Sequence, residues 1–148
     1  MPAVYIHSLL GSRNDQAGVA QTGQNRSINR ERLRADVLNQ QLADPNSFRA
    51  RVFAAYRHLL EVRRRTPAFH PNATQAAATL NDGAVLQLTR TPDSGEPTTC
   101  LFNMTDAIQV VELADSAFVD MLSTQFFHGP EIRLEPYAVL WLYVPVAG

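Results

Sequence analysis

The spacing of apolar residues changes from helical to alternating near residues 68–73, and this change constrains the fold more than any other feature. Upstream of it, apolar residues recur every three or four positions in two segments. That period predicts a helix over about residues 30–42, with Asn29 as its N-cap, and a second helix that starts after Asn46 or Ser47. The first part of the chain should therefore be helical.

The second helix should be amphipathic and should end before Pro67. Its apolar positions share one face: Val52, Tyr56, Leu59 and Leu60. Arg63, Arg64 and Arg65 occupy its last turn, where positive charge complements the helix dipole, and a proline cannot continue the helix. We interpret the three arginines as this solvated terminus and not as an anion site.

Beyond Pro71 the alternation predicts short strands separated by turn residues. Asn81, Asp82 and Gly83 are the strongest hairpin signal in the chain. Strands are expected at residues 75–80, 84–91, 99–104, 108–113, 131–134 and 138–144. The expected fold class is α+β, with one part over residues 1–70 and an antiparallel sheet or small sandwich over residues 71–148.

The first apolar segment has the pattern of a strand covered on both faces. Residues 3–10 are almost continuously apolar and Gly11 follows them. Such strands belong to parallel sheets, whose neighbours need long crossover connections. No chain precedes this strand, so we expect it to be cut from a larger domain. Residues 12–29 are polar and long for a connector, which is typical of functional loops.

Charge and composition narrow the classes of function. The first 71 residues hold 11 arginines against 5 acidic residues, and the remainder holds 2 against 9, giving +6 and −7. The arginines are spread over predicted helices without aromatic stacking partners, so nucleic-acid binding is not expected. The single Cys100 should be a small buried residue. Neither a membrane span nor a signal peptide is evident, so we expect a soluble, cytoplasmic protein.

Particular residues resemble one enzyme family. The first segment matches the last barrel strand and following loop of sucrose phosphorylases, members of glycoside hydrolase family 13 in the alpha-amylase superfamily. The matching residues are Pro2-Ala3-Val4-Tyr5, Leu9-Leu10-Gly11-Ser12-Arg13-Asn14-Asp15, Thr22-Gly23 and Asn25-Arg26-Ser27-Ile28-Asn29-Arg30. The helix that ends in residues 63–69 is similar to that subfamily's final barrel helix. The resemblance is weakest after residue 72, where the family has a C-terminal β-domain.

The resemblance implies the end of a (β/α)8 barrel followed by that β-domain. The family breaks an α-glucosidic bond with retention and passes the glucosyl group to phosphate, giving α-glucose 1-phosphate. Its catalytic carboxylates lie on earlier barrel strands, so no catalytic residue, cofactor or metal is expected in this chain. Arg26 matches a loop arginine that contacts substrate. Because Ser27 departs from the family's usual sequence, sucrose, sucrose 6-phosphate and glucosylglycerate all remain open as substrates.

Other candidate sites are weaker. The histidines His7, His58, His70 and His128 lack the spacing of metal ligands. No arrangement of histidine and aspartate near the serines suggests a catalytic triad, and Cys100 has no second thiol to pair with. Tyr137, Trp141 and Tyr143 alternate on one strand face, where core packing is commoner than sugar stacking.

Two readings of function follow. The first is a fragment of a glucosyl phosphorylase that lacks catalytic activity by itself. The second is a self-standing, non-enzymatic module whose β-domain binds carbohydrate or a protein. The severed strand at residues 3–10 also predicts self-association, because its unpaired backbone groups would offer a template to a second copy. The apolar stripe Val52, Tyr56, Leu59 and Leu60 is expected to take part in the same pairing.

Overall fold

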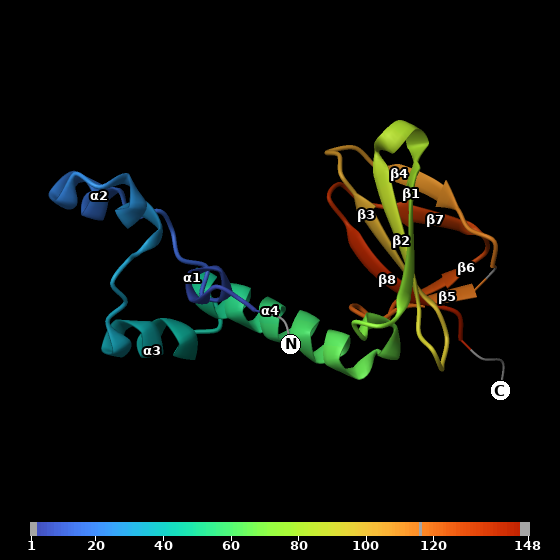
Figure 1. Cartoon of the computed structure of the whole chain (residues 1–148), viewed down its shortest axis with the longest axis horizontal. Helices are drawn as coiled ribbons and strands as arrows, with labels where there is room; N and C mark the ends of the chain where they lie inside the picture. The colour runs from blue at the N-terminus through green and yellow to red at the C-terminus, as the bar shows by residue number, and fades with distance from the viewer. Residues whose placement is uncertain (1–2, 116, 146–148) are drawn as a thin grey trace. The chain divides into compact units, whose positions relative to one another are not determined.

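The computed structural model describes residues 3–115 and 117–145, and the chain divides after Leu60 into two compact units. Helices make up the first unit, and two antiparallel sheets dominate the second (Figure 1). The elements of the first unit are α1 (Ile6–Leu9), α2 (Gln16–Thr22), the 3-10 helix η1 (Asn25–Asn29), α3 (Ala35–Ala43) and α4 (Phe48–Arg65), which continues past the division.

The predicted strand at residues 3–10 is wrong, because α1 lies there. The backbone N–H groups of Leu9 and Leu10 donate to the carbonyls of Tyr5 and Ile6, each at 3.0 Å. A strand would need a neighbour to satisfy these groups, whereas a helical turn satisfies them locally. Assignment of residues 1–70 to the end of a barrel therefore stays a prediction.

The predicted boundaries of the next two elements also change. The stretch over residues 12–29 is not irregular, because it contains α2 and η1. The helix expected from residue 30 begins at Ala35, and Asn29 lies in η1 and is not its N-cap. Arg34 occupies the N-cap position without a side-chain capping bond.

Helix α4 confirms the second predicted helix. Ser47 precedes it, and the Ser47 hydroxyl accepts a hydrogen bond from the Ala50 backbone N–H at 3.0 Å, which caps the helix. Gly11 approaches α4 closely, since a Cβ atom built there would lie 3.0 Å from Val52 Cγ2. The four predicted apolar positions of α4 are half-buried, not fully buried.

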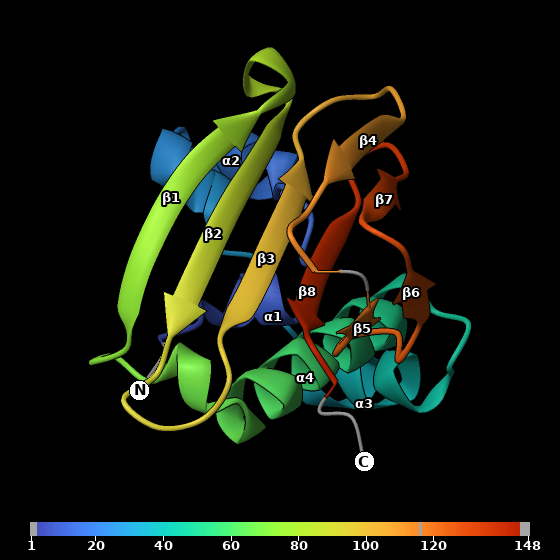
Figure 2. The ribbon, with the colours of Figure 1, turned by 90° about the vertical axis from the view of Figure 1, so that its right-hand side faces the viewer.

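The second unit contains two antiparallel sheets. The six-stranded sheet has the order β1-β2-β3-β8-β5-β6, and the other sheet pairs β4 with β7 (Figure 2). The strands are β1 (Thr74–Leu80), β2 (Val85–Thr91), β3 (Thr98–Asn103), β4 (Gln109–Glu112), β5 (Ala117–Asp120), β6 (Phe126–His128), β7 (Glu131–Leu134) and β8 (Val139–Tyr143). The predicted antiparallel β part and its six predicted strands are confirmed. Strands β5 and β6 were not predicted.

The core of this unit lies between the two sheets. Its buried members come from six strands: Val85, Leu101, Val111, Phe118, Ile132, Leu134 and Leu142. The predicted hairpin joins β1 to β2 through η3 (Asn81–Gly83), where three successive residues have positive φ. These conformations are those that asparagine, aspartate and glycine tolerate best, which is why this sequence makes the turn.

The junction between α4 and β1 is fixed to the sheet. The 3-10 helix η2 (Pro67–Phe69) follows α4, and the centroids of the Phe69 and Trp141 rings are 4.6 Å apart. Arg90 on β2 donates from Nε to the Ala68 carbonyl at 2.7 Å and from Nη2 to the His70 carbonyl at 2.8 Å. A single guanidinium thus satisfies backbone oxygens of a segment that has no strand partner.

One carboxylate is buried in the second unit. Asp120 is 1% exposed, and its oxygens accept from the Trp141 N–H at 2.8 Å, the Ser123 N–H at 2.9 Å and the Ser123 hydroxyl at 2.6 Å. These bonds tie the turn after β5 to β8. Since buried polar groups are costly unless hydrogen-bonded, Asp120 is a structural carboxylate.

Candidate functional site

The segment over residues 11–30 is folded and contains the two short helices α2 and η1. Asp15 begins α2 by accepting a hydrogen bond from the Gly18 N–H at 2.8 Å. Gly23 ends α2 with φ of 66°, a left-handed conformation that glycine adopts without strain. The Asp15 N–H donates to the Ile28 carbonyl at 2.8 Å and joins the two ends of the segment. Arg26 is therefore presented from a folded turn, η1, and not from irregular chain.

Arg26 is exposed and lacks a carboxylate partner. Its Nε donates to Gln24 Oε1 at 2.9 Å, and its two terminal NH₂ groups bond to no described residue. Two carboxylates line the same hollow as Arg26, but both are bonded elsewhere, since Asp15 caps α2 and Glu31 binds Arg49. The guanidinium therefore keeps most of its planar set of donors available for a ligand.

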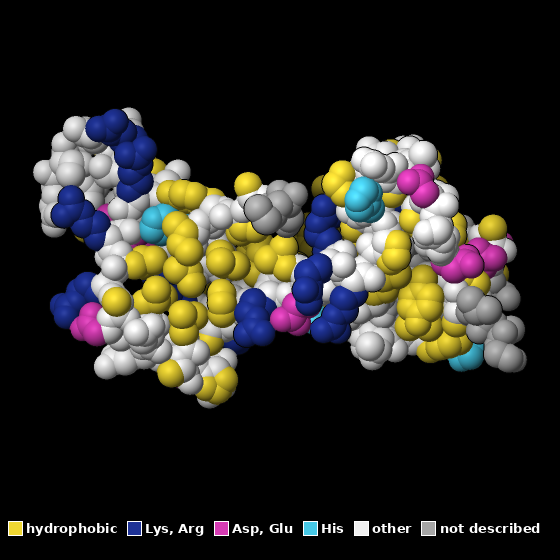
Figure 3. All heavy atoms as spheres, turned by 60° about the horizontal axis from the view of Figure 1, so that its bottom comes forward, with side chains coloured by type: hydrophobic (Ala, Val, Ile, Leu, Met, Phe, Trp, Pro, Cys, Tyr) yellow, Lys and Arg dark blue, Asp and Glu magenta, His cyan; other side chains and the backbone are white. Residues whose placement is uncertain are grey.

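Two further arginines face the same hollow. A concavity of about 790 Å³ is lined by Arg26, Arg30 and Arg32, by the hydroxyl residues Thr22 and Ser27, and by Asp15 and Glu31. Figure 3 shows basic side chains gathered over the α2–η1 segment. Three guanidiniums and two hydroxyls suit a ligand that is both anionic and hydroxylated.

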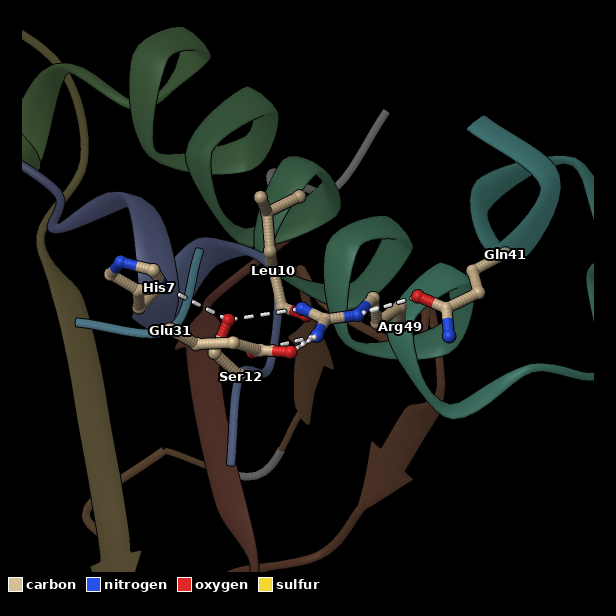
Figure 4. Close-up of polar contacts among 6 residues, drawn as sticks. All are labelled: His7, Leu10, Ser12, Glu31, Gln41 and Arg49. Atoms are coloured by element: carbon tan, nitrogen blue, oxygen red, sulfur yellow. Dashed lines mark hydrogen bonds and ion pairs between the residues drawn. The ribbon is translucent and has the colours of Figure 1, made fainter. Parts of the chain in front are cut away.

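Arg49 is the best-connected side chain of the helical unit (Figure 4). Its Nη1 donates to the Leu10 carbonyl at 3.1 Å and to Ser12 Oγ at 3.0 Å. Its Nη2 donates to both oxygens of Glu31, at 3.1 and 2.9 Å, and its Nε donates to Gln41 Oε1 at 2.8 Å. The side chain is 13% exposed. Arg49 thus joins α4 to three separate segments and fixes the position of the loop that carries Arg26.

Arg49 was not singled out from the sequence. Its partners Glu31, Ser12 and Leu10 lie 18, 37 and 39 residues away along the chain, so no local pattern reveals the cluster. The one available signal is an arginine in the first turn of a helix. That position is unfavourable for a cation near the helix dipole unless the charge is paired.

The structure brings together His7 and Ser12, a pair that the sequence did not suggest. His7 Nδ1 lies 3.0 Å from Ser12 Oγ, and the centroids of the Tyr5 and His7 rings are 5.2 Å apart. The Ser12 oxygen also accepts from Arg49, and no carboxylate orients His7 among the described residues. Because no such carboxylate is present in the described part of the chain to complete a catalytic triad, we interpret the pair as structural.

The aromatic residues Tyr137, Trp141 and Tyr143 lie only partly where the sequence predicted them. Trp141 and Tyr143 lie on β8, where Trp141 packs against Phe69. Tyr137 is not on the strand, because it adopts a positive φ of 56° in the preceding turn and is 67% exposed. The three rings therefore do not form one platform, and the contact of Trp141 is core packing.

The remaining candidates show no reactive site. No cluster of three metal-ligating side chains occurs among residues 3–115 and 117–145. Cys100 is buried as predicted, and burial raises the pKa of its thiol to about 11, against a smaller opposite effect of Arg90. The thiol is therefore protonated at neutral pH and unreactive. In the same described part, no helix combines the length and apolar character that a bilayer span requires.

Known proteins match nearly the whole chain. It is 40% identical over 142 residues to the glucosylglycerate phosphorylase of Allomeiothermus silvanus, which covers 96% of this chain and 24% of the relative. It is 36% identical to the glucosylglycerate phosphorylase of Escherichia coli, with 96% and 25% covered. The chain thus spans about a quarter of the length of these curated relatives. The match confirms the resemblance to the C-terminal part of a sucrose-phosphorylase-like enzyme.

Two further comparisons concern the fold. Residues 82–142 match the family model of the C-terminal immunoglobulin-like domain of D-apionate lactonase. The crystal structure of the trehalulose synthase from Pseudomonas mesoacidophila aligns with a TM-score of 0.55 and 19% identity, over 88% of this chain and 24% of that one. The isomaltulose synthase of Erwinia rhapontici aligns with a TM-score of 0.54 and 21% identity, over 72% and 20%. At these identities the structural matches establish the fold alone.

Proposed function

We propose that this chain is the C-terminal part of a glucosyl phosphorylase of the alpha-amylase superfamily, which transfers an α-glucosyl group to phosphate with retention. The observation that carries the proposal is the 36–40% identity to glucosylglycerate phosphorylases over 96% of the chain. Residues 1–70 would complete the catalytic barrel and residues 71–148 would form its β-domain. The two catalytic carboxylates of a retaining mechanism would lie in the part of the enzyme that this chain does not include.

The proposed substrate is glucosylglycerate together with inorganic phosphate. Each relative reported above bears the name of that activity, and the glycerate moiety adds a carboxylate to a hydroxylated sugar. The hollow lined by Arg26, Arg30 and Arg32 also contains Asp15 and Glu31, but these carboxylates bond to the Gly18 N–H and to Arg49. Guanidinium groups form charged, often bidentate hydrogen bonds, which bind carboxylate and phosphate groups better than neutral donors do. Its chemistry therefore favours the acidic substrate over sucrose.

The chain by itself should release no glucose 1-phosphate from glucosylglycerate and phosphate, because positioned carboxylates supply the chemistry. A chimera in which the chain replaces the matching quarter of the Allomeiothermus silvanus relative should release it. A coupled glucose 1-phosphate assay measures both. Activity of the chain alone that survives repurification, or a folded chimera without activity, would contradict the proposal.

In that chimera, substitution of Arg26 with alanine should lower kcat/KM for glucosylglycerate by about 10- to 100-fold, the worth of one charged hydrogen bond. Arg26→Lys should recover part of the loss, because it restores the charge without the planar fork. Arg51→Ala is the matched control, since Arg51 is an exposed arginine on α4 outside the hollow. Equal kcat/KM values for Arg26→Ala and the control would show that Arg26 does not contact the substrate.

A further inference from the structure

The outer edge of β1 is unpaired in the described chain. The strand stands at one end of the six-stranded sheet and pairs with β2 alone (Figure 2). Its register with β2 runs without a bulge from Thr74 opposite Thr91 to Leu80 opposite Val85. Half of its backbone N–H and C=O groups therefore point away from the sheet, in a regular ladder that another strand can join.

This edge lacks the features that prevent pairing between molecules. Seven residues long, β1 contains no charged residue and no proline. The other described edges differ, since β6 has three residues and β4 and β7 carry Glu112, Glu131 and Arg133. Natural sheets block exposed edges with charges, prolines, bulges or short strands. By this criterion β1 is the open edge of the molecule.

Both faces of β1 are also uncovered. Every residue from Thr74 to Thr79 is exposed, and Leu80 is half-buried. Three successive alanines, Ala76, Ala77 and Ala78, occupy the middle of the strand. Their small side chains let a second backbone approach along the whole edge without steric conflict on either face.

We propose that the β1 edge binds the β1 edge of a second copy of this chain, in an antiparallel pair with two-fold symmetry about Ala77. The strand is nearly self-complementary in that arrangement, because Ala76 meets Ala78 of the other copy and Gln75 meets Thr79. A two-fold interface needs this property, since each surface must fit itself. The two six-stranded sheets would then form one continuous sheet.

This surface replaces the one expected from the sequence. Self-association was predicted through a strand at residues 3–10 together with the apolar face of α4, and the helix α1 at residues 6–9 leaves no strand edge to pair. The β1 proposal rests only on the second unit and does not depend on the phosphorylase assignment. The acidic surface of this part of the chain, −7 over residues 72–148, opposes close approach of two copies. Added salt should therefore strengthen the dimer by screening that repulsion.

The test is a sedimentation-velocity series on the 148-residue chain across concentration, at low and high salt. The wild type should shift from monomer to dimer with concentration, and more readily at high salt. In Ala77→Lys, two like charges face each other across the two-fold axis, so the dimer should be lost. Val110→Lys is the matched control, because it puts the same charge on an exposed strand residue of the other sheet and should leave the dimer intact.

A charge-pair experiment separates the interface from misfolding. Ala77→Lys and Ala77→Glu should each be monomeric, and an equimolar mixture should form a heterodimer, because opposite charges then face each other. A monomeric wild type at every concentration would overturn the proposal. So would a dimer that persists in Ala77→Lys, a dimer lost in Val110→Lys, or a mixture that stays monomeric.

Discussion

Substitution of Asp120 with alanine is expected to lower the free energy of unfolding of the β unit by about 2–4 kcal/mol. The carboxylate is 1% exposed and accepts three hydrogen bonds, from the Trp141 N–H and from the N–H and hydroxyl of Ser123. Alanine leaves these donors without acceptors. The cost is largest for the Trp141 amide, because Ser123 is exposed and can bond to water instead.

Urea unfolding followed by tryptophan fluorescence measures this change, since Trp141 is the only tryptophan and its backbone binds Asp120. Asp120→Asn keeps one acceptor oxygen and should lose less stability than Asp120→Ala. Asp106→Ala is the matched control, because Asp106 is an exposed aspartate in a turn of the same unit. If Asp120→Ala and the control unfold at the same urea concentration, the assigned role of the carboxylate is wrong.

The second large effect is expected at Arg49 in the helical unit. Arg49→Met removes five hydrogen bonds while keeping an unbranched apolar stem, and should destabilise that unit by about 2–3 kcal/mol. Part of the loss arises because the Leu10 carbonyl, on a residue that is 5% exposed, is left without its donor. Glu31 is half-exposed, so its carboxylate can bond to water in place of Arg49, which limits the total loss of stability.

Hydrogen exchange locates the Arg49 effect. Amides in α1 and α3, which Arg49 connects to α4 through Leu10 and Gln41, should exchange faster in Arg49→Met. Arg51→Met changes an exposed arginine of the same helix and should leave these rates unaltered. Protection of α1 and α3 that is equal in the two variants would show that Arg49 does not join the segments.

The strands that the sequence predicted share two properties. They are rich in apolar or β-branched residues, and turn-forming residues bound them, as in the hairpin at Asn81, Asp82 and Gly83. Strand β6 has only three residues, and β5 begins with three successive apolar residues, so neither shows a period. They exist because they pair with each other and β5 pairs with β8, and those partners are distant in sequence.

Residues 3–10, predicted as a strand and found as a helix, show a second limit of prediction from sequence. A short apolar run has the same appearance in a buried strand and in a helix, and only its neighbours decide between them. Within this chain no strand lies beside residues 3–10 among the residues described, so local hydrogen bonds form α1. Tyr137 was misplaced for a related reason, since the strand pattern extends through it but a positive φ places it in a turn.

The candidate site was predicted only in part. Arg26 was identified through a resemblance of motifs, and its role in substrate binding stays a prediction. The neighbouring Arg30 and Arg32 became candidates only when the fold of the loop placed them around one hollow. Glu31 lines the same hollow, but its carboxylate is bonded to Arg49, whose contacts span 8 to 39 residues along the chain. Side-chain pairings over such distances leave no trace in a single sequence.

The attachment of residues 68–70 to β2 by Arg90 bears on how the β unit could be exchanged between proteins during evolution. A gene fusion that joined a new partner at Pro71, where alternation begins, would omit the Ala68 and His70 carbonyls that Arg90 binds and the Phe69 ring that covers Trp141. The segment that must be transferred as a whole therefore begins in the last turns of α4, at Glu61, where the second compact unit starts. Recombination between relatives should be tolerated best at breakpoints upstream of Pro67.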